Sequence, residues 1–298
     1  MAIDNTTTVP KIVAATFLKE YQRSRVFAAR VNNTYRNMLN AYGDTIIINR
    51  PGPASVKDYA ANDTINYANA DVGTPLELSM DKVKTWAVKF DDLLAAISKP
   101  NVLQDAVIEH ARVLAETVDA DVRAKHIAGA TAARALTLNT EKNNLGIADL
   151  KIETFHRTMD LANMPREGRW AIVGPFYAEI VQKVALANDR ILGNADSGGN
   201  RSLVNGAMGS FAGFQWYVAP GTFSTQGSPT SGKFSATETV IYGNDTAVAF
   251  LDQIRKTERI RLETTFADAV RGLYKYGAQI VYPNRLFKSE TTISNVPV

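Results

Sequence analysis

The stretch that decides the fold is "FADAVRGLYKYGAQIVYPNRL", residues 266–286. It mixes tyrosines, cations and glycines in a pattern typical of strands, and it contains no group of catalytic side chains. Two interpretations are open at this point. The stretch is either a strand that completes a core, or part of a protein that packs against copies of itself.

The composition is that of a globular protein with a sizeable core. The chain has 298 residues, of which 45% are hydrophobic and 21% charged. It has no cysteine, which excludes disulfides, a thiolate nucleophile and a Cys-based zinc site. No apolar run approaches the roughly 18 residues of a membrane span. The N-terminus lacks the pattern of a signal peptide, so we expect synthesis in the cytoplasm and no membrane partner.

The net charge of +3 is unevenly distributed along the chain. Residues 1–40 carry six cations and two anions, a net charge of +4, and residues 251–290 carry eight cations and five anions, a net charge of +3. The middle of the chain is therefore acidic. Basic ends around an acidic middle indicate either a polyanion partner or contacts between the ends of one copy and the middle of another.

The strongest secondary-structure signal is a long helix over residues 101–130. Thirty helical residues at about 1.5 Å each would extend about 45 Å. Residues 11–31 predict an amphipathic helix near the N-terminus, and residues 147–162 predict a further helix. The apolar residues of the long helix recur at spacings of four or seven: Leu103, Val107, Leu114, Val118 and Val122.

Residues 43–91 predict an extended hairpin. Two strand-like arms of roughly 14–17 residues flank the polar, turn-rich segment "AANDTINYANADVG" (60–73). A two-stranded hairpin is at best marginally stable alone in water. We therefore expect this hairpin to be stabilised by a neighbour.

The remaining chain mixes helices and strands without a regular alternation. Loops rich in Gly, Asn and Ser are predicted over 193–210 and 221–235. This order favours an α+β fold over a doubly wound sheet. The further strands are predicted in "GRWAIV" (168–173), "GFQWYVAPG" (213–221), "ETVIYG" (238–243) and "AVAFLDQIRKTERIRLE" (247–263).

The nearest enzymatic motif is "GSPTSGKF", Gly227 to Phe234. It matches a phosphate-binding loop up to Lys233, but Phe234 occupies the position of the Mg²⁺-binding Ser or Thr. That motif also requires a following helix, whereas "ETVIYG" predicts a strand. A P-loop-like nucleotide-binding enzyme is therefore kept only as an alternative from another class, and we expect no catalytic residue and no cofactor.

The sequence also offers no metal site. His110 and His126 are 16 residues apart on the long helix, so they point in different directions. His156 is isolated. The tryptophans are expected to be core aromatics on strands: Trp86, Trp170 and Trp216.

Three stretches, taken in order, resemble the major capsid protein of tailed bacteriophages, the family with the HK97-type shell fold. "PREGRWAIVGPFYAEIVQ" (165–182) is similar to the Arg-Gly-Arg strand of that family, followed by Pro and a helix. "NGAMGSFAGFQWYVAPG" (205–221) is similar to its glycine-rich segment before Tyr-Val. Residues 247–286 resemble its closing strands, in which Phe-x-Asp-x-x-x-Gly precedes Tyr-Gly-x-x-Val-x-x-Pro.

The resemblance implies a division of the chain. We expect an N-terminal arm over 1–42, an E-loop hairpin over 43–91, a peripheral (P) domain over 92–164 built on the long helix as its spine, an axial (A) domain over 165–250, and a return to the P domain over 251–298. In the closing segment, Phe266, Tyr274, Tyr276 and Tyr282 would fill a sheet beneath the spine helix. Gly272 and Gly277 would permit turns or close approach there.

The resemblance also implies function and partners. The chain would assemble into hexamers and pentamers of an icosahedral phage head around double-stranded DNA, in a virion assembled in the bacterial host cytoplasm. A separate scaffolding protein and a portal protein are implied, and a decoration protein is left open. The expected intersubunit contacts are Arg23, Arg25, Arg30, Tyr59, Asn62, Asp63 and Tyr67.

Two questions stay open at the level of the sequence. An encapsulin-like cellular compartment of the same fold, which encloses protein cargo, is the alternative within this class. Some family members crosslink a hairpin Lys to an Asn of a neighbour. Lys57 and Asn284 are nominal candidates, but nothing around them in the sequence argues for that chemistry.

Overall fold

The structure is a computed structural model of the 298-residue chain. The residues that it describes are 17, 19–20, 25–38, 45–50, 58, 61, 75–91, 102–133, 136–139, 152–187, 210–211, 213–219, 223–226 and 233–297.

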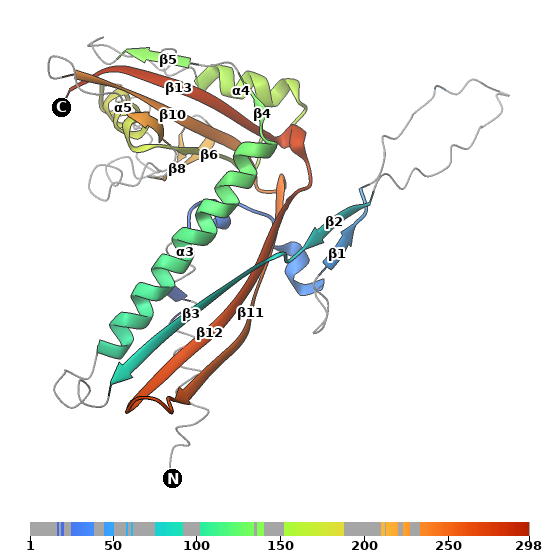
Figure 1. The fold of residues 1–298 in the computed structure, drawn as a ribbon. Coiled ribbons are helices and arrows are strands. Elements are labelled where there is room, and N and C mark those ends of the chain that lie inside the picture. Colours follow the sequence, from blue (N-terminus) through green and yellow to red (C-terminus); the bar gives the residue numbers. More distant parts are fainter. Residues whose placement is uncertain are drawn as a thin grey trace.

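Within the described residues, one half of the molecule is a three-stranded antiparallel sheet covered by a long helix (Figure 1). The strand order is β11–β12–β3, and helix α3 runs along one face of this sheet. The strands of 10 to 14 residues are long compared with the usual 5 or 6. The bounds are β3 Lys82–Asp91, α3 Val102–Gly129, β11 Val248–Arg261 and β12 Ala267–Ile280.

Helix α3 confirms the predicted spine helix almost to the residue. Its apolar stripe is buried against the sheet, including Val107, Leu114, Val118 and Val122. On the exposed face, Arg112 forms ion pairs of 2.6 Å with Glu109 and Glu116, one turn away on either side. These pairs add a few tenths of a kcal/mol each, roughly 0.2–0.5, so burial of the stripe is the larger source of helix stability.

The other half is a mixed sheet with the order β4–β13–β10–β6–β8–β7 among the described strands. Strands β6 and β8 are parallel and β10 is antiparallel to both β6 and β13, as expected for an α+β fold. Strand β5 pairs with β13, and β9 pairs with β10. The bounds are β4 Thr131–Ala132, β5 Leu136–Asn139, α4 Ile152–Leu161, β6 Arg169–Val173, α5 Pro175–Ala187, β7 Ser210–Phe211, β8 Phe214–Val218, β9 Phe223–Gln226, β10 Lys233–Asn244 and β13 Leu286–Pro297.

The tryptophans are core aromatics, as predicted. Trp86 on β3, Trp170 on β6 and Trp216 on β8 are at most 5% exposed. Trp86 and Trp170 belong to one core that spans both sheets beside α3, whereas Trp216 belongs to a second core between the mixed sheet, α4 and α5.

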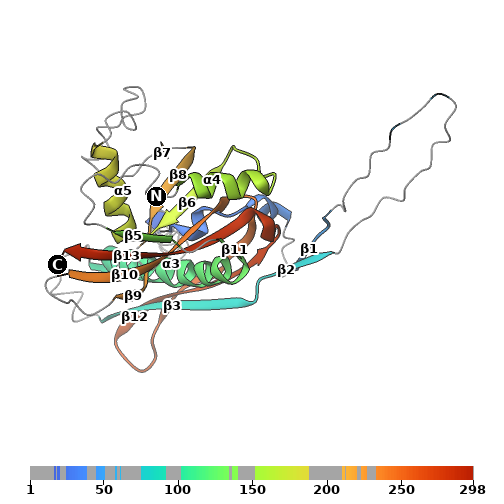
Figure 2. The same cartoon turned by 90° about the horizontal axis from the view of Figure 1, so that it is seen from above.

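A short hairpin projects from the body (Figure 2). Strands β1 (Thr45–Ile48) and β2 (Leu76–Ser79) pair in an antiparallel ladder from Thr45 opposite Ser79 to Ile48 opposite Leu76. The second arm of the predicted hairpin is divided. Residues 76–79 pair with β1, but 82–91 form β3 and pair with β12. The chain leaves the hairpin at Met80, where 2% exposure shows that the side chain turns into the body.

The helix predicted over residues 11–31 is wrong for its C-terminal part. Phe17, Lys19 and Glu20 are helical, but Phe27–Ala29 form the 3-10 turn η1, and a second such turn, η2, covers Thr34–Met38. The backbone N–H groups of residues 26–28 donate to a carboxylate on α3 instead of to carbonyls one turn earlier. Without these i−4 hydrogen bonds an α-helix ends.

Strand pairing also differs from the predicted boundaries at residues 165 and 251. Helix α4 packs with the mixed sheet through Ile152, Phe155 and Met159. Strand β13 pairs with β10 along almost its full length. Both therefore lie with strands of residues 165–250, and β13 also contacts the end of the spine helix, where Nζ of Lys288 donates to the carbonyl of Ile127 at 3.0 Å. The predicted loop over 221–235 contains strand β9, because its residues pair with β10.

The closing segment fills the sheet beneath α3 with two of the four predicted aromatics. Tyr274 and Tyr276 are 1% exposed and belong to the core that spans both sheets beside α3, which we call the main core. Tyr282 packs beside the hairpin core instead. Phe266 was predicted to be buried, and this is wrong, because its side chain is 83% exposed at the turn that joins β11 to β12.

Gly272 and Gly277 allow close approach within β12 and form no turn. A Cβ atom on Gly272 would lie 2.4 Å from Nε1 of Trp86, and one on Gly277 would lie 1.9 Å from the carbonyl oxygen of Ser79. The second contact is with backbone, which cannot rotate away. Gly277 is therefore what lets the end of β2 lie against β12.

We predict that Gly277→Ala lowers the free energy of unfolding of the subunit by about 3 kcal/mol, the upper end of the cost of overpacking. Gly129→Ala is the matched control. Its Cβ would meet only Cδ1 and Cγ1 of the Ile280 side chain, which can rotate, so we expect a loss below about 1 kcal/mol. Chemical denaturation of unassembled subunits measures both values. Equal midpoints for the two variants would contradict this account of Gly277.

Candidate assembly interface

The described part of the N-terminal arm is fixed to α3 by one carboxylate. Asp119 accepts backbone hydrogen bonds from Val26 at 2.7 Å, from Phe27 at 3.0 Å and from Ala28 at 2.9 Å. Phe27 and Ala28 are buried in the main core. The half-buried Asp119 thus satisfies three N–H groups that would otherwise lie unpaired beside apolar side chains.

A second carboxylate holds the arm on β11. Asp252 is 5% exposed. It lies 3.6 Å from Nη1 of Arg25 and 3.2 Å from Nε of Arg36, and the hydroxyl of Tyr274 donates to it at 2.9 Å. One buried anion therefore pairs with two arm cations and accepts a hydrogen bond from a core tyrosine, so the buried carboxylate has the partners that it requires.

The structure describes two of the seven predicted intersubunit residues, and both make contacts within their own chain. The Arg25 side chain is 10% exposed beside Asp252. The guanidinium of Arg30 lies 4.3 Å from the centre of the Tyr217 ring on β8. The other five lie outside the described residues: Arg23, Tyr59, Asn62, Asp63 and Tyr67.

The hairpin is anchored at its base by a small apolar core. Ile48, Leu78 and Met80 pack against Ala249, Leu251 and Val281 of the body. Arg50 adds a hydrogen bond of 2.8 Å from Nη1 to the carbonyl of Val281. The opposite face of β1 carries Ile47, which is 67% exposed. The base thus fixes the direction in which the hairpin leaves the subunit.

The far end of the β11–β12 ribbon is rich in cations. Arg259 and Arg261 pair with Asp268, and Lys256 and Arg271 pair with Glu258. The hydrogen bond from Arg259 lowers the pKa of Asp268, and that from Lys256 lowers the pKa of Glu258. Phe266 stands exposed beyond these pairs.

A shallow hollow lies on the sheet face that α3 does not cover. It measures about 500 Å³ and is lined by Thr85 and Ala87 of β3, Lys256 and Glu258 of β11, and Arg271, Gly272 and Leu273 of β12, with Trp86 beside them. This cationic, partly apolar face is open to solvent in the isolated subunit.

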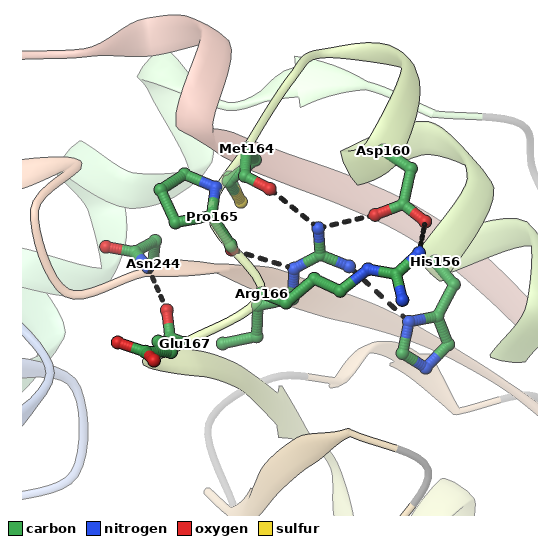
Figure 3. Close-up of polar contacts among 8 residues, drawn as sticks. His156, Asp160, Met164, Pro165, Arg166, Glu167 and Asn244 are labelled. Atoms are coloured by element: carbon green, nitrogen blue, oxygen red, sulfur yellow. Dashed lines mark hydrogen bonds and ion pairs between the residues drawn. The ribbon is translucent and has the colours of Figure 1, made fainter.

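The loop between α4 and β6 is held by the buried guanidinium of Arg169, whose partners Asp160, Met164 and Pro165 are labelled in Figure 3. Nη2 donates to Asp160 Oδ1 at 2.6 Å and to the carbonyl of Met164 at 2.8 Å, while Nε donates to the carbonyl of Pro165 at 3.0 Å. Arg166 reaches the other oxygen of Asp160 at 3.1 Å. This cluster explains why the stretch Arg166-Glu167-Gly168-Arg169 starts a strand at a fixed position.

Charge around this loop perturbs one carboxyl group. The hydrogen bond from Arg169 is the main cause that lowers the pKa of Asp160, and it outweighs a smaller opposing effect of burial. Nδ1 of His156 lies 3.5 Å from Nη1 of Arg169 on the other side. Nδ2 of Asn244 holds the same loop by donating a hydrogen bond of 2.8 Å to the carbonyl of Glu167.

Helix α5 begins on a carboxylate from a distant strand. Glu238 of β10 is fully buried and accepts N–H groups from Phe176 at 3.0 Å and Tyr177 at 2.9 Å. Burial raises the pKa of Glu238. Gly174 is required here because a Cβ would lie 2.3 Å from the carboxyl group. The contact fixes α5 on the mixed sheet.

The described residues do not offer an enzymatic site. Among them no group of three or more His, Asp or Glu side chains could hold a metal ion. Lys233 begins strand β10, so a strand follows the Gly227–Lys233 motif where a phosphate-binding loop needs a helix. Residues 227–232 lie outside the described part. Among the described residues no helix is long and apolar enough to cross a bilayer.

Comparison with known proteins shows the fold. No protein-family model and no curated protein matches the sequence. A chain from Mycobacterium phage Che8 is 22% identical with a TM-score of 0.66, over 89% of this chain and 90% of that one. The capsid of Cyanophage P-SCSP1u is 17% identical with a TM-score of 0.59, over 85% and 84%.

A virus-like particle from Pyrococcus furiosus is also similar, with 9% identity and a TM-score of 0.52, over 98% of this chain and 100% of that one. The phage structures are the more similar in both measures. The chain therefore has the HK97-type fold of phage capsid subunits.

The sequence did not reveal the two carboxylates that hold the arm. Asp119 is one of several acids on α3, and Asp252 lies within an alternating strand, so neither has a local signature. In the sequence, Asp119 is only an acid that follows Val118 of the apolar helix stripe. Asp252 is likewise only an acid that follows Leu251 of a predicted strand.

We predict that Arg169→Met lowers the free energy of unfolding by about 3 kcal/mol, because Asp160 and two carbonyls lose a buried donor. Arg166→Met is the matched control. Arg166 pairs with the same carboxylate, but its side chain is 83% exposed, so we expect a change below about 0.5 kcal/mol. Denaturant titration distinguishes the two, and similar losses would contradict the role given to Arg169.

The lowered pKa of Asp160 predicts a pH dependence of stability. Because the folded pKa lies below the unfolded value of about 3.9, the contribution is fully present above that value and is lost as pH falls through the folded pKa. Asp160→Asn should therefore flatten the acid limb of the stability curve below about pH 4. An unchanged acid limb, measured by thermal unfolding across pH, would argue against this pair.

Proposed function

We propose that the chain is the major capsid protein of a tailed phage. It assembles into hexamers and pentamers of an icosahedral shell that encloses double-stranded DNA. The single observation that carries this proposal is the HK97-type fold, shared over 89% of the chain with a Che8 structure and over 85% with the cyanophage capsid. The same fold makes a structural role, without catalysis, the simplest function.

The proposed mechanism is assembly by heterologous contacts that close under symmetry. Two elements are suited to such contacts: the chain before Arg25, and the segment between the short strands β1 and β2. The segment itself, residues 49–75, contains three acids and two cations, but residues 58–81, which include its second part and strand β2, contain five acids and no cation: Asp58, Asp63, Asp71, Glu77 and Asp81. The cationic ribbon end and the open sheet face of a neighbouring copy offer the complementary charge.

The partners follow from this function. A separate scaffolding protein would guide assembly in the bacterial host cytoplasm, and a portal protein would replace one pentamer. Double-stranded DNA would lie inside the shell, and a decoration protein could bind outside it. In this proposal the arm contacts neighbouring subunits in preference to DNA, since Arg25 and Arg36 already pair with Asp252.

Particle content tests the proposal against its nearest rival. The chain should form hollow icosahedral particles visible by negative-stain electron microscopy, and particles from infected cells should contain double-stranded DNA. Particles that enclose protein instead of DNA would favour an encapsulin-like compartment. A chain that stays monomeric at all concentrations, with or without scaffolding protein, would overturn the capsid function.

Deletion of residues 59–74 should leave a folded subunit that no longer forms shells. These residues are mostly small and polar, and the hairpin base below them keeps its own core of Ile48, Leu78 and Met80. Thermal unfolding should therefore match the intact subunit, while sedimentation and microscopy show no particles. Normal particles from the deleted chain would exclude this segment as an assembly element.

A further inference from the structure

Residues 25–36 contact three parts of the subunit at once, which sets them apart from the rest of the described arm. They touch helix α3, the mixed sheet and the three-stranded sheet. Among the described residues, the two sheets are also joined by the turn from β10 to β11, by the connection from β12 to β13, by the passage of α3 into β4, and by the core that spans both of them beside α3. Figure 1 shows α3 running from one sheet to the other.

The contact with α3 is specific to the backbone of the segment. The three N–H groups that converge on Asp119 belong to consecutive residues, Val26 to Ala28. An acceptor that binds three consecutive amides fixes the backbone of the turn itself, and not only a side chain. Substitution of side chains in η1 would leave these hydrogen bonds in place.

The contact with the mixed sheet has two components. Arg30 stacks on Tyr217 of β8 with 4.3 Å from the guanidinium carbon to the ring centre. Phe27 lies 5.9 Å from the ring of His126, which lies 5.8 Å from that of Trp170 on β6. Burial lowers the pKa of His126 to about 4, so the imidazole is neutral and packs as an apolar ring near pH 7.

The contact with the three-stranded sheet is a short strand pairing. Asn32 donates its N–H to the carbonyl of Val248 at 2.7 Å and accepts from the N–H of Phe250 at 3.1 Å, in a parallel bridge to Ala249. Arg25 and Arg36, at the two ends of the segment, both reach Asp252 on the same strand. The segment is thus attached to β11 by backbone and by charge.

We propose that residues 25–36 form a brace that fixes the angle between the two sheets, with Asp119 as its positioning residue, and that this angle sets the curvature of the assembled shell. The brace itself follows from the contacts within one subunit. Its effect on curvature rests on the proposed capsid function. In a shell, each heterologous contact closes only at a rotation that suits the ring it forms, so a looser angle would allow shells of several sizes.

The absence of cysteine makes the angle measurable, because two introduced cysteines would be the only ones in the chain. Leu161→Cys at the end of α4 and Phe266→Cys at the ribbon tip lie on opposite halves, and the native side chains there are 78% and 83% exposed. Spin labels at both sites report the distance by double electron–electron resonance. Dilution of labelled full-length chains among unlabelled ones restricts the signal to distances within a subunit.

The doubly labelled subunit without further change should give one narrow distance distribution. Asp119→Ala should at least double its width, and Asp119→Glu should restore part of the order. The matched control is Glu116→Ala, which removes an exposed carboxylate of the same helix that pairs with Arg112, and it should leave the distribution unchanged. An equally narrow distribution for folded Asp119→Ala would overturn the brace.

If Asp119→Ala does not fold, Arg30→Gln provides the second test, since it removes the stacking on Tyr217 without touching Asp119. It should broaden the distribution, and a narrow distribution would overturn the brace. Shell diameters then test the curvature. If unmodified chains form no shells, the capsid function fails while the distance result stands. If they do, unchanged diameters for a variant with a broadened distribution would refute the effect on curvature.

Discussion

The structure depends on mutual coverage between helix α3 and the three long strands beneath it. A ribbon of strands this long exposes two faces. Its apolar face is buried only if another element, here a helix, covers it. The helix in turn buries its apolar stripe in one core with this sheet, the arm and part of the mixed sheet. Close approach at Gly272, where the Trp86 ring occupies the place of a side chain, allows the strands to lie together beneath the helix.

Elements with a strong local pattern could be predicted from the sequence. The 3.6-residue repeat located α3 within one residue at each end, and strands β6 and β8 followed from apolar runs bounded by turn residues. The pairing of these elements was less accessible. That residues 82–91 join β12 instead of the hairpin, and that β13 pairs with β10, depends on contacts between residues up to 194 positions apart, such as Lys82 with Tyr276 and Phe234 with Val296.

The polar contacts were hidden from the sequence for a related reason. Asp119, Asp252 and Glu238 each accept hydrogen bonds from a segment far away in the chain, so no local motif marks them. The helix expected through residue 31 ends early because the N–H groups of residues 26–28 donate to Asp119 instead of to helix carbonyls. Phe266 was expected in the core because its apolar character was visible, but its place at a ribbon tip was not.

The position of β13 in the sheet has a consequence for the timing of folding. Strand β10 has its longest pairing with β13, which follows every other strand of the mixed sheet in the sequence. The ribosome therefore releases β4 to β10 before it has made β13, the strand that lies between β4 and β10 in the sheet. The mixed sheet cannot close while residues 286–297 are still in the exit tunnel, so its finished surface forms only after both strands of the β11–β12 ribbon have been made.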